Sequence, residues 1–219
     1  TNGGPAESVS VNKAGLTFRL CNGYYNDDVN YFNRVAAVNS GVVDEVKNIY
    51  EATLGIVPNN NAREYYSVEW YGFFYATVTG TWTFFTGSDD ASYLWIGDVA
   101  VSGYNNGNAT VNNCCLHPWV ERSGTANLEK GKYYPIRIQF GENWGGDNIN
   151  VSWTPPGGVR TDNGIGYFFL NNTPQSEAKT SACPGGGCFT APHVYLPIEP
   201  VIGVLLSIGT NGWRHHMFD

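Results

Sequence analysis

The chain has 219 residues, of which 14% are charged and 15% are aromatic, and its formal net charge is −7. With 12 lysine and arginine residues and no basic cluster, it lacks the positive surface that a nucleic-acid-binding protein needs. No apolar run approaches the roughly 18 residues of a membrane-spanning helix, and the aromatic content argues against disorder. The composition therefore predicts a folded protein and is typical of extracellular β-proteins and carbohydrate-binding proteins.

Short runs of β-branched and aromatic residues, separated by turn residues, predict an all-β protein. Helix signals are weak, and we expect only short helical turns within residues 33–54, where Asn-Ser-Gly interrupts the apolar residues. Many short strands with frequent turns are typical of an antiparallel β-sandwich or barrel. We expect strands at residues 15–20, 65–78, 81–86, 92–96, 99–101, 132–140, 148–153 and 167–170.

Neighbouring strands of this series are expected to pair as hairpins. The two runs on either side of Thr79-Gly80 predict one antiparallel hairpin, and those on either side of Gly97-Asp98 flank a second tight turn. The glycine-rich segment 141–147 separates the two runs of a third predicted hairpin.

Five cysteines indicate disulfide bonds more strongly than a zinc site, because no second closely spaced pair of ligands accompanies the pair near the C-terminus. Adjacent cysteines rarely bridge each other, since the ring that they would close is strained. We therefore expect the adjacent pair to bond to two different partners, with one thiol left over. The cysteines are Cys21, Cys114, Cys115, Cys183 and Cys188.

Three Asn-X-Ser/Thr sequences begin at Asn108, Asn150 and Asn171, and each is a potential N-glycosylation site. Together with the predicted disulfide bonds, they indicate a secreted protein.

The most specific chemical feature is the pair Asp89-Asp90, which follows one aromatic strand and precedes another. Successive side chains of an extended chain point to opposite faces, so both carboxylates can reach one ion only if the backbone bends between them. A hard cation with six to eight oxygen ligands would bring such carboxylates together, and Ca²⁺ fits best. The alternative is an exposed turn with two solvated carboxylates, which we accept for the similar pair Asp27-Asp28.

Four segments resemble the PA14 family. Residues 70–74 and 79–97, which contain the Ser-Asp-Asp loop and an apolar strand that ends in glycine, are similar to the core of that family. Residues 135–146 resemble its next block, a strand that opens into a Gly-rich loop. Residues 162–168 are similar to the motif that names the GLEYA subgroup, the ligand-binding domains of fungal cell-surface adhesins.

The resemblance extends over about residues 13–170 and implies a PA14-like antiparallel β-sandwich or barrel with long disulfide-pinned loops. We expect residues 1–219 to form a single ligand-binding domain, in which 171–219 act as a C-terminal strap. The resemblance also implies how the adjacent cysteines pair: Cys114 with Cys21, and Cys115 with Cys183 or Cys188.

In the PA14 family a cis-linked Asp pair binds Ca²⁺, and a second loop adds an Asn side chain and backbone carbonyls. In this chain Glu142 stands where that Asn usually stands and Asn143 follows it, so either side chain could complete the site. The implied metal-binding residues are Asp89, Asp90, Glu142, Asn143 and Trp144. The implied glycan-binding residues are Asp89, Asp90, Asn143, Trp144 and Gly145.

An aromatic ring offers an apolar face to a sugar, and Trp144 suits that role because it lies in a glycine-flanked loop. Trp119 is an alternative. Tyr93 and Trp95 are predicted core residues instead, because they lie on an expected strand.

The resemblance thus predicts a non-enzymatic, calcium-dependent glycan-binding domain of a fungal adhesin. Its expected partners are terminal mannose, galactose or N-acetylglucosamine of cell-surface glycans or chitin, bound by a monomeric domain displayed in many copies on the cell wall. We expect neither nucleic acid nor membrane insertion. Two alternatives stay open: an accessory carbohydrate-binding module of a secreted glycoside hydrolase, and a protein-binding cell-wall module.

Overall fold

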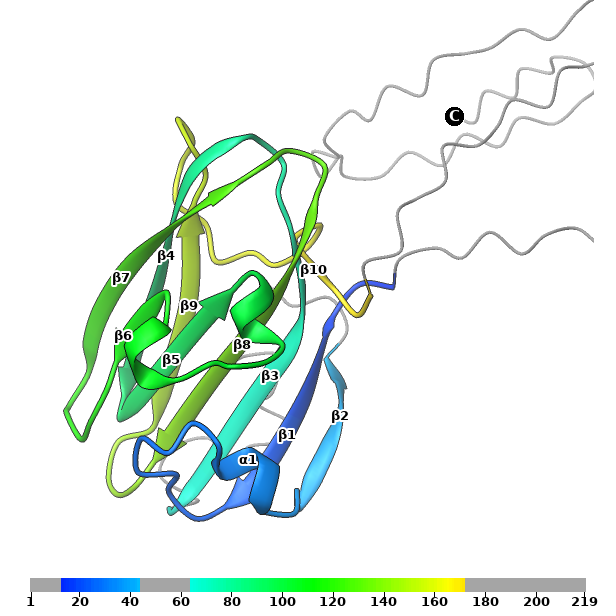
Figure 1. Ribbon diagram of the computed structural model, residues 1–219. Helices are drawn as coiled ribbons and strands as arrows, with labels where there is room; N and C mark the ends of the chain where they lie inside the picture. The colour runs from blue at the N-terminus through cyan, green and yellow to red at the C-terminus, as the bar shows by residue number, and fades with distance from the viewer. Residues whose placement is uncertain (1–12, 44–63, 172–219) are drawn as a thin grey trace, which may run out of the picture. The chain divides into compact units, whose positions relative to one another are not determined.

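The computed structural model describes residues 13–43 and 64–171, which form two antiparallel sheets that face each other as layers of a sandwich (Figure 1). The larger sheet has the strand order β2-β1-β3-β8-β5-β6, with β10 paired to β3, and the smaller sheet has the order β7-β4-β9. The predicted all-β antiparallel fold is thereby confirmed. The strands are β1 (Leu16–Asn22), β2 (Asn39–Val43), β3 (Tyr66–Tyr75), β4 (Gly80–Asp89), β5 (Ala91–Ile96), β6 (Val111–Asn113), β7 (Val120–Leu128), β8 (Tyr133–Glu142), β9 (Asn148–Thr154) and β10 (Phe168–Phe169).

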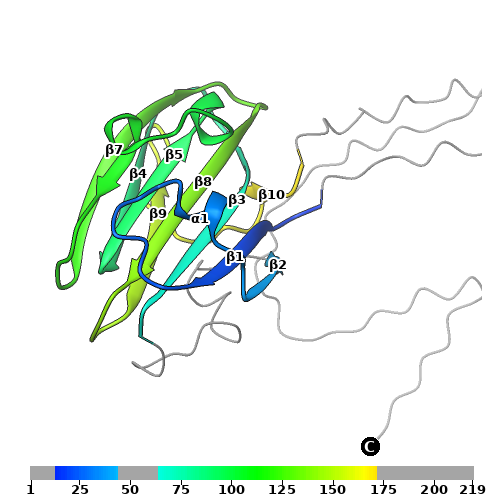
Figure 2. The ribbon, with the colours of Figure 1, turned by 60° about the horizontal axis from the view of Figure 1, so that its bottom comes forward.

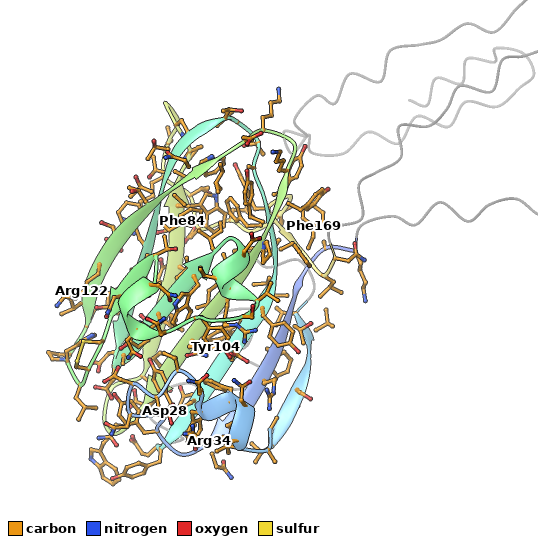
Figure 3. All side chains as sticks on the ribbon, in the orientation of Figure 1. Asp28, Arg34, Phe84, Tyr104, Arg122 and Phe169 are labelled. Carbon is orange, nitrogen blue, oxygen red and sulfur yellow. A yellow bond between two sulfur atoms is a disulfide. The ribbon has the colours of Figure 1, made fainter. Side chains whose placement is uncertain are left out.

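Aromatic side chains fill the space between the two sheets. The ring of Phe74 on β3 lies with its centroid 5.3 Å from Trp82, 5.2 Å from Phe84 and 5.4 Å from Trp153 on the facing sheet. These edge-to-face contacts are the favoured geometry for aromatic pairs, and all four side chains are fully buried. Phe84 is labelled in Figure 3, where it lies inside the sandwich. The core thus uses much of the aromatic content seen in the sequence.

A second apolar cluster covers the outer face of the larger sheet. Tyr93 and Trp95 of β5 are buried there against the segment that contains Tyr25 and the short helix α1 (Tyr31–Arg34). The predicted core positions of Tyr93 and Trp95 are therefore confirmed. The helix lies close to β1 in both ribbon views (Figures 1 and 2), and no helix among the described residues is long and apolar enough to cross a membrane.

The predicted hairpin across Thr79-Gly80 is wrong. β3 pairs with β1, β8 and β10 in the larger sheet, whereas β4 pairs with β7 and β9 in the smaller sheet. The chain crosses the sandwich between Tyr75 and Gly80 because the aromatic faces of the two strands bury each other across the core, not side by side in one sheet.

The other two predicted hairpins are also wrong. β8 and β9 also belong to different sheets, and the run after Gly97-Asp98 is the 3₁₀ helix η1 (Asp98–Ala100), not a strand. In the region where only helical turns were expected, β2 extends the larger sheet by pairing with β1. Residues 44–54 of that region and 172–219 of the predicted strap lie outside the described part of the chain, so the single-domain organisation stays a prediction.

A disulfide bond joins Cys114 to Cys115, so the expectation that these residues bond to two different partners is wrong. Cys115 adopts a left-handed φ of 79°, and its N–H donates to Asp27 Oδ1 at 3.1 Å. Cys21 is a buried free thiol, which overturns the implied pairing with Cys114. The remaining cysteines, Cys183 and Cys188, lie outside the described residues.

Peptide mapping tests this pairing. Proteolysis of the unreduced protein is expected to release a peptide in which Cys114 and Cys115 together lack two hydrogen atoms, without a link to another peptide. The Cys21 thiol should react with an alkylating reagent only after unfolding, because it is buried. A cross-linked peptide that contains both Cys21 and Cys114 would contradict the structure.

Candidate metal and glycan site

The acidic pair lies at the point where the chain passes from one sheet to the other. β4 of the smaller sheet ends at Asp89, and β5 of the larger sheet begins at Ala91. The peptide bond between Asp89 and Asp90 is cis, as the resemblance implies. Both carboxylates therefore belong to a connection between the two layers, and not to an exposed turn.

Strand pairing brings a third carboxylate to the same place. β8 pairs with β5 so that Gly141 lies opposite Ala91, and Glu142 is the last residue of β8. One carboxylate oxygen each of Asp89, Asp90 and Glu142 lies within 4.8 Å of the other two. We call these three residues the acidic cluster. Asp90 is 6% exposed and Glu142 is fully buried, so most of the cluster is removed from water.

Two loops close around the acidic cluster. The loop 114–119 between β6 and β7 supplies the N–H of His117, which donates to Asp90 Oδ1 at 3.3 Å, and the backbone N–H of Trp119, which donates to Asp89. The loop 143–147 between β8 and β9 supplies the N–H of Asn143, which donates to Asp90 Oδ2 at 3.0 Å. Both loops lie at the lower end of the sandwich in Figure 1.

Glu142 stands apart in the cluster because neither of its carboxylate oxygens has a hydrogen-bond partner in the described part of the chain. Buried carboxylates are normally paired or hydrogen-bonded, since an uncompensated buried charge is costly. None of the ion pairs among the described residues includes a member of the acidic cluster. The Glu142 carboxylate therefore needs a hydrogen-bond donor or a positive charge that the described residues do not provide.

Titration behaviour reflects the same imbalance. Burial, with the charges of Asp90, Asp147 and Asp89 in that order, raises the pKa of Glu142 to about 8. Burial and the charge of Asp90 also raise the pKa of Asp89, against an opposing effect of His117. A bound cation would reverse these shifts because it favours the ionised carboxylates.

The other predicted site residues lie on the loop 143–147. Asn143 contributes its backbone N–H, as described above, and its side chain is half-buried. Trp144 is 67% exposed, and Gly145 N–H donates to Glu64 Oε2 at 2.9 Å. Trp119, the alternative aromatic residue, is 46% exposed, and its ring covers Gly87 so closely that a Cβ there would lie 2.5 Å away.

Sequence analysis missed four residues that surround this site. His117 donates to Asp90, and Asp147 accepts a hydrogen bond from Tyr66 Oη at 2.8 Å. Glu64 binds the backbone of the loop 143–147, and the ring of Tyr65 packs against Trp144. No local motif marks these residues, because their role depends on strand pairing between distant parts of the chain.

Carboxylates, partly buried and held by backbone donors, are the ligands that a hard cation such as Ca²⁺ prefers. Both Glu142 oxygens lack a hydrogen-bond partner among the described residues, so they are available to bind a cation. The residues present therefore fit a Ca²⁺ ion.

Comparison with known proteins finds one family whose model matches part of the chain. The GLEYA domain family matches residues 66–155, from the start of β3 to just beyond β9, and this range contains the whole acidic cluster. The predicted resemblance to the PA14 and GLEYA domains of fungal adhesins is thereby confirmed. A search of curated proteins finds no match.

Solved structures share the fold at low sequence identity. The A domain of epithelial adhesin 6 from Candida glabrata, in complex with Galβ1-3GlcNAc, matches with a TM-score of 0.58 and 19% identity over 84% of this chain and 96% of its own. The epithelial adhesin 9 A domain of the same organism, in complex with Galβ1-4GlcNAc, gives 0.51 and 19% over 78% and 94%. The PA14 domain of the antifreeze protein MpAFP gives 0.52 and 13% over 78% and 98%.

Proposed function

We propose that this chain, which carries a GLEYA domain at residues 66–155, is a calcium-dependent glycan-binding domain of a cell-surface adhesin. The observation that carries the proposal is the buried carboxylate of Glu142, which has no hydrogen-bond partner among residues 13–43 and 64–171 and has an oxygen within 4.8 Å of one oxygen each of Asp89 and Asp90. A calcium ion supplies the missing positive charge, and the oxygen ligands match its chemistry.

Asp89, Asp90 and Glu142 would hold the ion, with Asn143 and the carbonyl of Trp144 as further candidates. When bound, Ca²⁺ would offer open coordination positions to two neighbouring hydroxyl groups of a sugar. Oxygens of Asp89 and Asp90 accept hydrogen bonds from those hydroxyls, while Trp144 and Gly145 border the bound glycan. The N–H groups of Asn143 and His117 hold the Asp90 carboxylate in place.

Galactose-terminated glycans are the proposed ligands. The solved adhesin domains that share the fold were crystallised with Galβ1-3GlcNAc and Galβ1-4GlcNAc. Mannose ends and chitin, which the sequence left open, gain no support from these comparisons. Many copies of a weak single site on a cell surface would supply avidity, which suits an extracellular adhesin.

A hydrolytic function is the less favoured alternative. Retaining and inverting glycosidases place two carboxyl groups on either side of the scissile bond, about 5 Å or more apart. Here three carboxylates gather instead of two, with one oxygen of each within 4.8 Å of the others, and a single shared cation could bind all three. We therefore propose a binding function without catalysis.

A glycan array with and without EDTA tests the proposal. With Ca²⁺ present, the protein is expected to bind galactose-terminated glycans, and EDTA should abolish that binding because the carboxylates alone cannot hold the hydroxyls. Adding Ca²⁺ back should restore it. Binding that persists in EDTA would overturn the mechanism, and release of free sugar from the array would favour the hydrolase.

A further inference from the structure

Two of the Asn-X-Ser/Thr sequences lie wholly within the described residues, and their asparagines have different surroundings. One begins at Asn108 in the 3₁₀ helix η2 (Asn106–Asn108), and the other begins at Asn150 on β9. The third, which begins at Asn171, extends beyond the described residues. The surroundings of the first two asparagines decide which of them can carry an N-linked glycan in the folded protein.

The side-chain amide of Asn108 is engaged inside its own loop. Its Oδ1 accepts the indole N–H of Trp95 at 3.1 Å and the backbone N–H of Asn105 at 2.8 Å. Its Nδ2 donates to the carbonyl of Gly103 at 3.0 Å. Because Trp95 is fully buried, the amide of Asn108 holds the loop 103–108 against the core of the outer cluster.

A glycan on Asn108 would break this network. N-glycosylation replaces one hydrogen of Nδ2 by C1 of a sugar, and the resulting secondary amide is planar with Cβ and C1 trans to each other. C1 then lies on the same side of the amide as Oδ1. Because Oδ1 already accepts two donors, one of them occupies that side. We therefore expect the folded protein to leave Asn108 unmodified.

Asn150 faces away from the core, on the outer side of the smaller sheet. Its neighbours Ile149 and Val151 are buried between the sheets, so the alternation along β9 turns the half-buried Asn150 side chain the other way. No described residue forms a hydrogen bond with this side chain, so its Nδ2 is available. Asn150 lines a surface hollow of about 300 Å³, the lower end of the size of small-ligand sites. The hollow is also lined by Ser152, Arg160, Thr161 and Asp162.

Fixed polar groups form part of the hollow. The guanidinium of Arg160 lies over the ring of Phe85, with its carbon 3.9 Å from the ring centroid. Its Nε donates to Ser152 Oγ at 2.9 Å, and Glu121 accepts from its two terminal nitrogens. These contacts use three of the five N–H donors of a guanidinium. The remaining donors and the carboxylate of Asp162 suit the hydroxyl and acetamido groups of a sugar.

Trp119 adds an apolar surface beside Asn150. Gly87 lies directly opposite Asn150 in the pairing of β4 with β9, and the indole of Trp119 covers Gly87. Opposite residues of neighbouring strands lie about 5 Å apart, so this partly exposed ring borders Asn150. Aromatic faces pack well against the C–H surface of a pyranose ring. A sugar on Asn150 would therefore have an apolar face and polar groups within reach.

The position of Asn150 supplies a physical reason for a glycan. β9 is an edge strand of the smaller sheet, and none of its residues Asn148–Thr154 is charged or a proline. Among the described residues, the free side of β9 has a partner only at Trp153, which pairs with Thr161. Such edges can pair with another chain, and natural proteins usually cover or charge them. A glycan at Asn150 would cover this edge.

We propose that Asn150 carries an N-linked glycan, that its first N-acetylglucosamine lies in the hollow, and that Asn108 is not modified. The donor is a lipid-diphosphate-linked oligosaccharide of the secretory pathway. A bond forms between Asn150 Nδ2 and C1 of the first sugar while the bond from C1 to the diphosphate breaks. Nδ2 loses a proton, and the lipid diphosphate is the leaving group. The modification requires secretion but neither Ca²⁺ nor a glycan ligand, so it goes beyond the proposed function.

Glycopeptide mapping of the full chain, secreted from yeast, tests the site. Peptide N-glycosidase F in ¹⁸O-labelled water converts each glycosylated asparagine to a labelled aspartate. We expect the label at Asn150 and none at Asn108. Asn150→Gln should remove the labelled site. Asn148→Gln is the matched control, because Asn148 is exposed on the same face of β9 but begins no Asn-X-Ser/Thr sequence, and it should keep the label at Asn150.

Thermal unfolding in EDTA tests the contact of the sugar with the hollow. An endoglycosidase that leaves one N-acetylglucosamine on the asparagine should preserve the Tm of the intact glycoprotein. The secreted Asn150→Gln variant should unfold about 2–4 °C lower. In a bacterial periplasm, where no glycan is added, the unmodified chain and Asn150→Gln should have equal Tm values. This pair of hosts separates the effect of the glycan from that of the substitution.

Asn108→Gln should lower the Tm in both hosts, because it disrupts the hydrogen bonds of the loop 103–108. An unlabelled Asn150 or a labelled Asn108 in the secreted protein would overturn the assignment. A labelled Asn150 whose substitution lowers the Tm equally in both hosts, or in neither, would overturn the place of the sugar in the hollow. These results leave the proposed function intact, since no measurement involves Ca²⁺ or a glycan ligand.

Discussion

Asp90→Asn is expected to lower the affinity for Ca²⁺ at least about 100-fold and to abolish detectable glycan binding. Asp90 is the member of the acidic cluster that both loops hold, through the N–H groups of His117 and Asn143. Asparagine preserves the shape and one acceptor oxygen but removes a negative charge that the cation needs. Isothermal titration calorimetry with CaCl₂, followed by titration with Galβ1-3GlcNAc, measures both effects.

Asp98→Asn is the matched control because Asp98 is an exposed acidic residue at the start of η1, outside the acidic cluster. It makes the same change of charge and should leave both affinities within about twofold. If Asp90→Asn still binds Ca²⁺ like the unmodified protein, the acidic cluster is not the metal site. If it loses Ca²⁺ but still binds glycan, the ion does not take part in recognition.

The second prediction concerns stability against pH without metal. The pKa of Glu142 is about 8 in the folded protein, against 4.5 as its ordinary value. Between these values the folded state keeps a proton that the unfolded state has released, so stability falls as pH rises through this window. The free energy of unfolding should decrease by up to about 1.4 kcal/mol for each pH unit and level off above pH 8.

Glu142→Gln isolates that contribution. Glutamine cannot ionise, so its difference in stability from the unmodified protein should grow between about pH 5 and 8, in favour of the variant. The variant must be compared with the unmodified protein because the raised pKa of Asp89 also makes the stability of both proteins depend on pH. Urea unfolding in EDTA at several pH values gives the two curves.

Calcium should reverse the result. At pH 8 the ion is expected to stabilise the unmodified protein more than Glu142→Gln, because only the unmodified protein has the third carboxylate. Parallel stability curves in EDTA, or equal stabilisation of both proteins by Ca²⁺, would show that Glu142 is not an uncompensated member of the cluster.

Local sequence patterns were sufficient to predict the strands themselves. Aromatic and β-branched runs mark β3, β4, β5, β8 and β9, and the burial of Tyr93 and Trp95 follows from their positions on such a run. The patterns could not show which strands pair. Two strands joined by a short turn have the same sequence pattern whether they pair in one sheet or face each other from two sheets. The packing of Phe74 on β3 against Trp82 on β4 shows that these two strands face each other.

The cysteines show the same limit. The sequence argument against a bond between adjacent cysteines was the strain of the ring that they would close. In the structure the bond forms where Cys115 has a left-handed backbone, and no residue type nearby announces that conformation.

For the site, the sequence by itself determined the unusual residues: an Asp pair between aromatic strands and a glycine-rich loop with Glu142, Asn143 and Trp144. Only the tertiary structure decided that Glu142 is buried beside that pair and has no hydrogen-bond partner in the part of the chain that the structure describes, because the pairing of β5 with β8 brings these residues together. It also decided the place of Tyr65, whose ring packs against Trp144. A backbone hydrogen bond from Tyr65 to Asn143 joins the two segments, which are almost 80 residues apart in the chain. Charge and ring type are local properties, whereas proximity and burial arise only when distant strands pair.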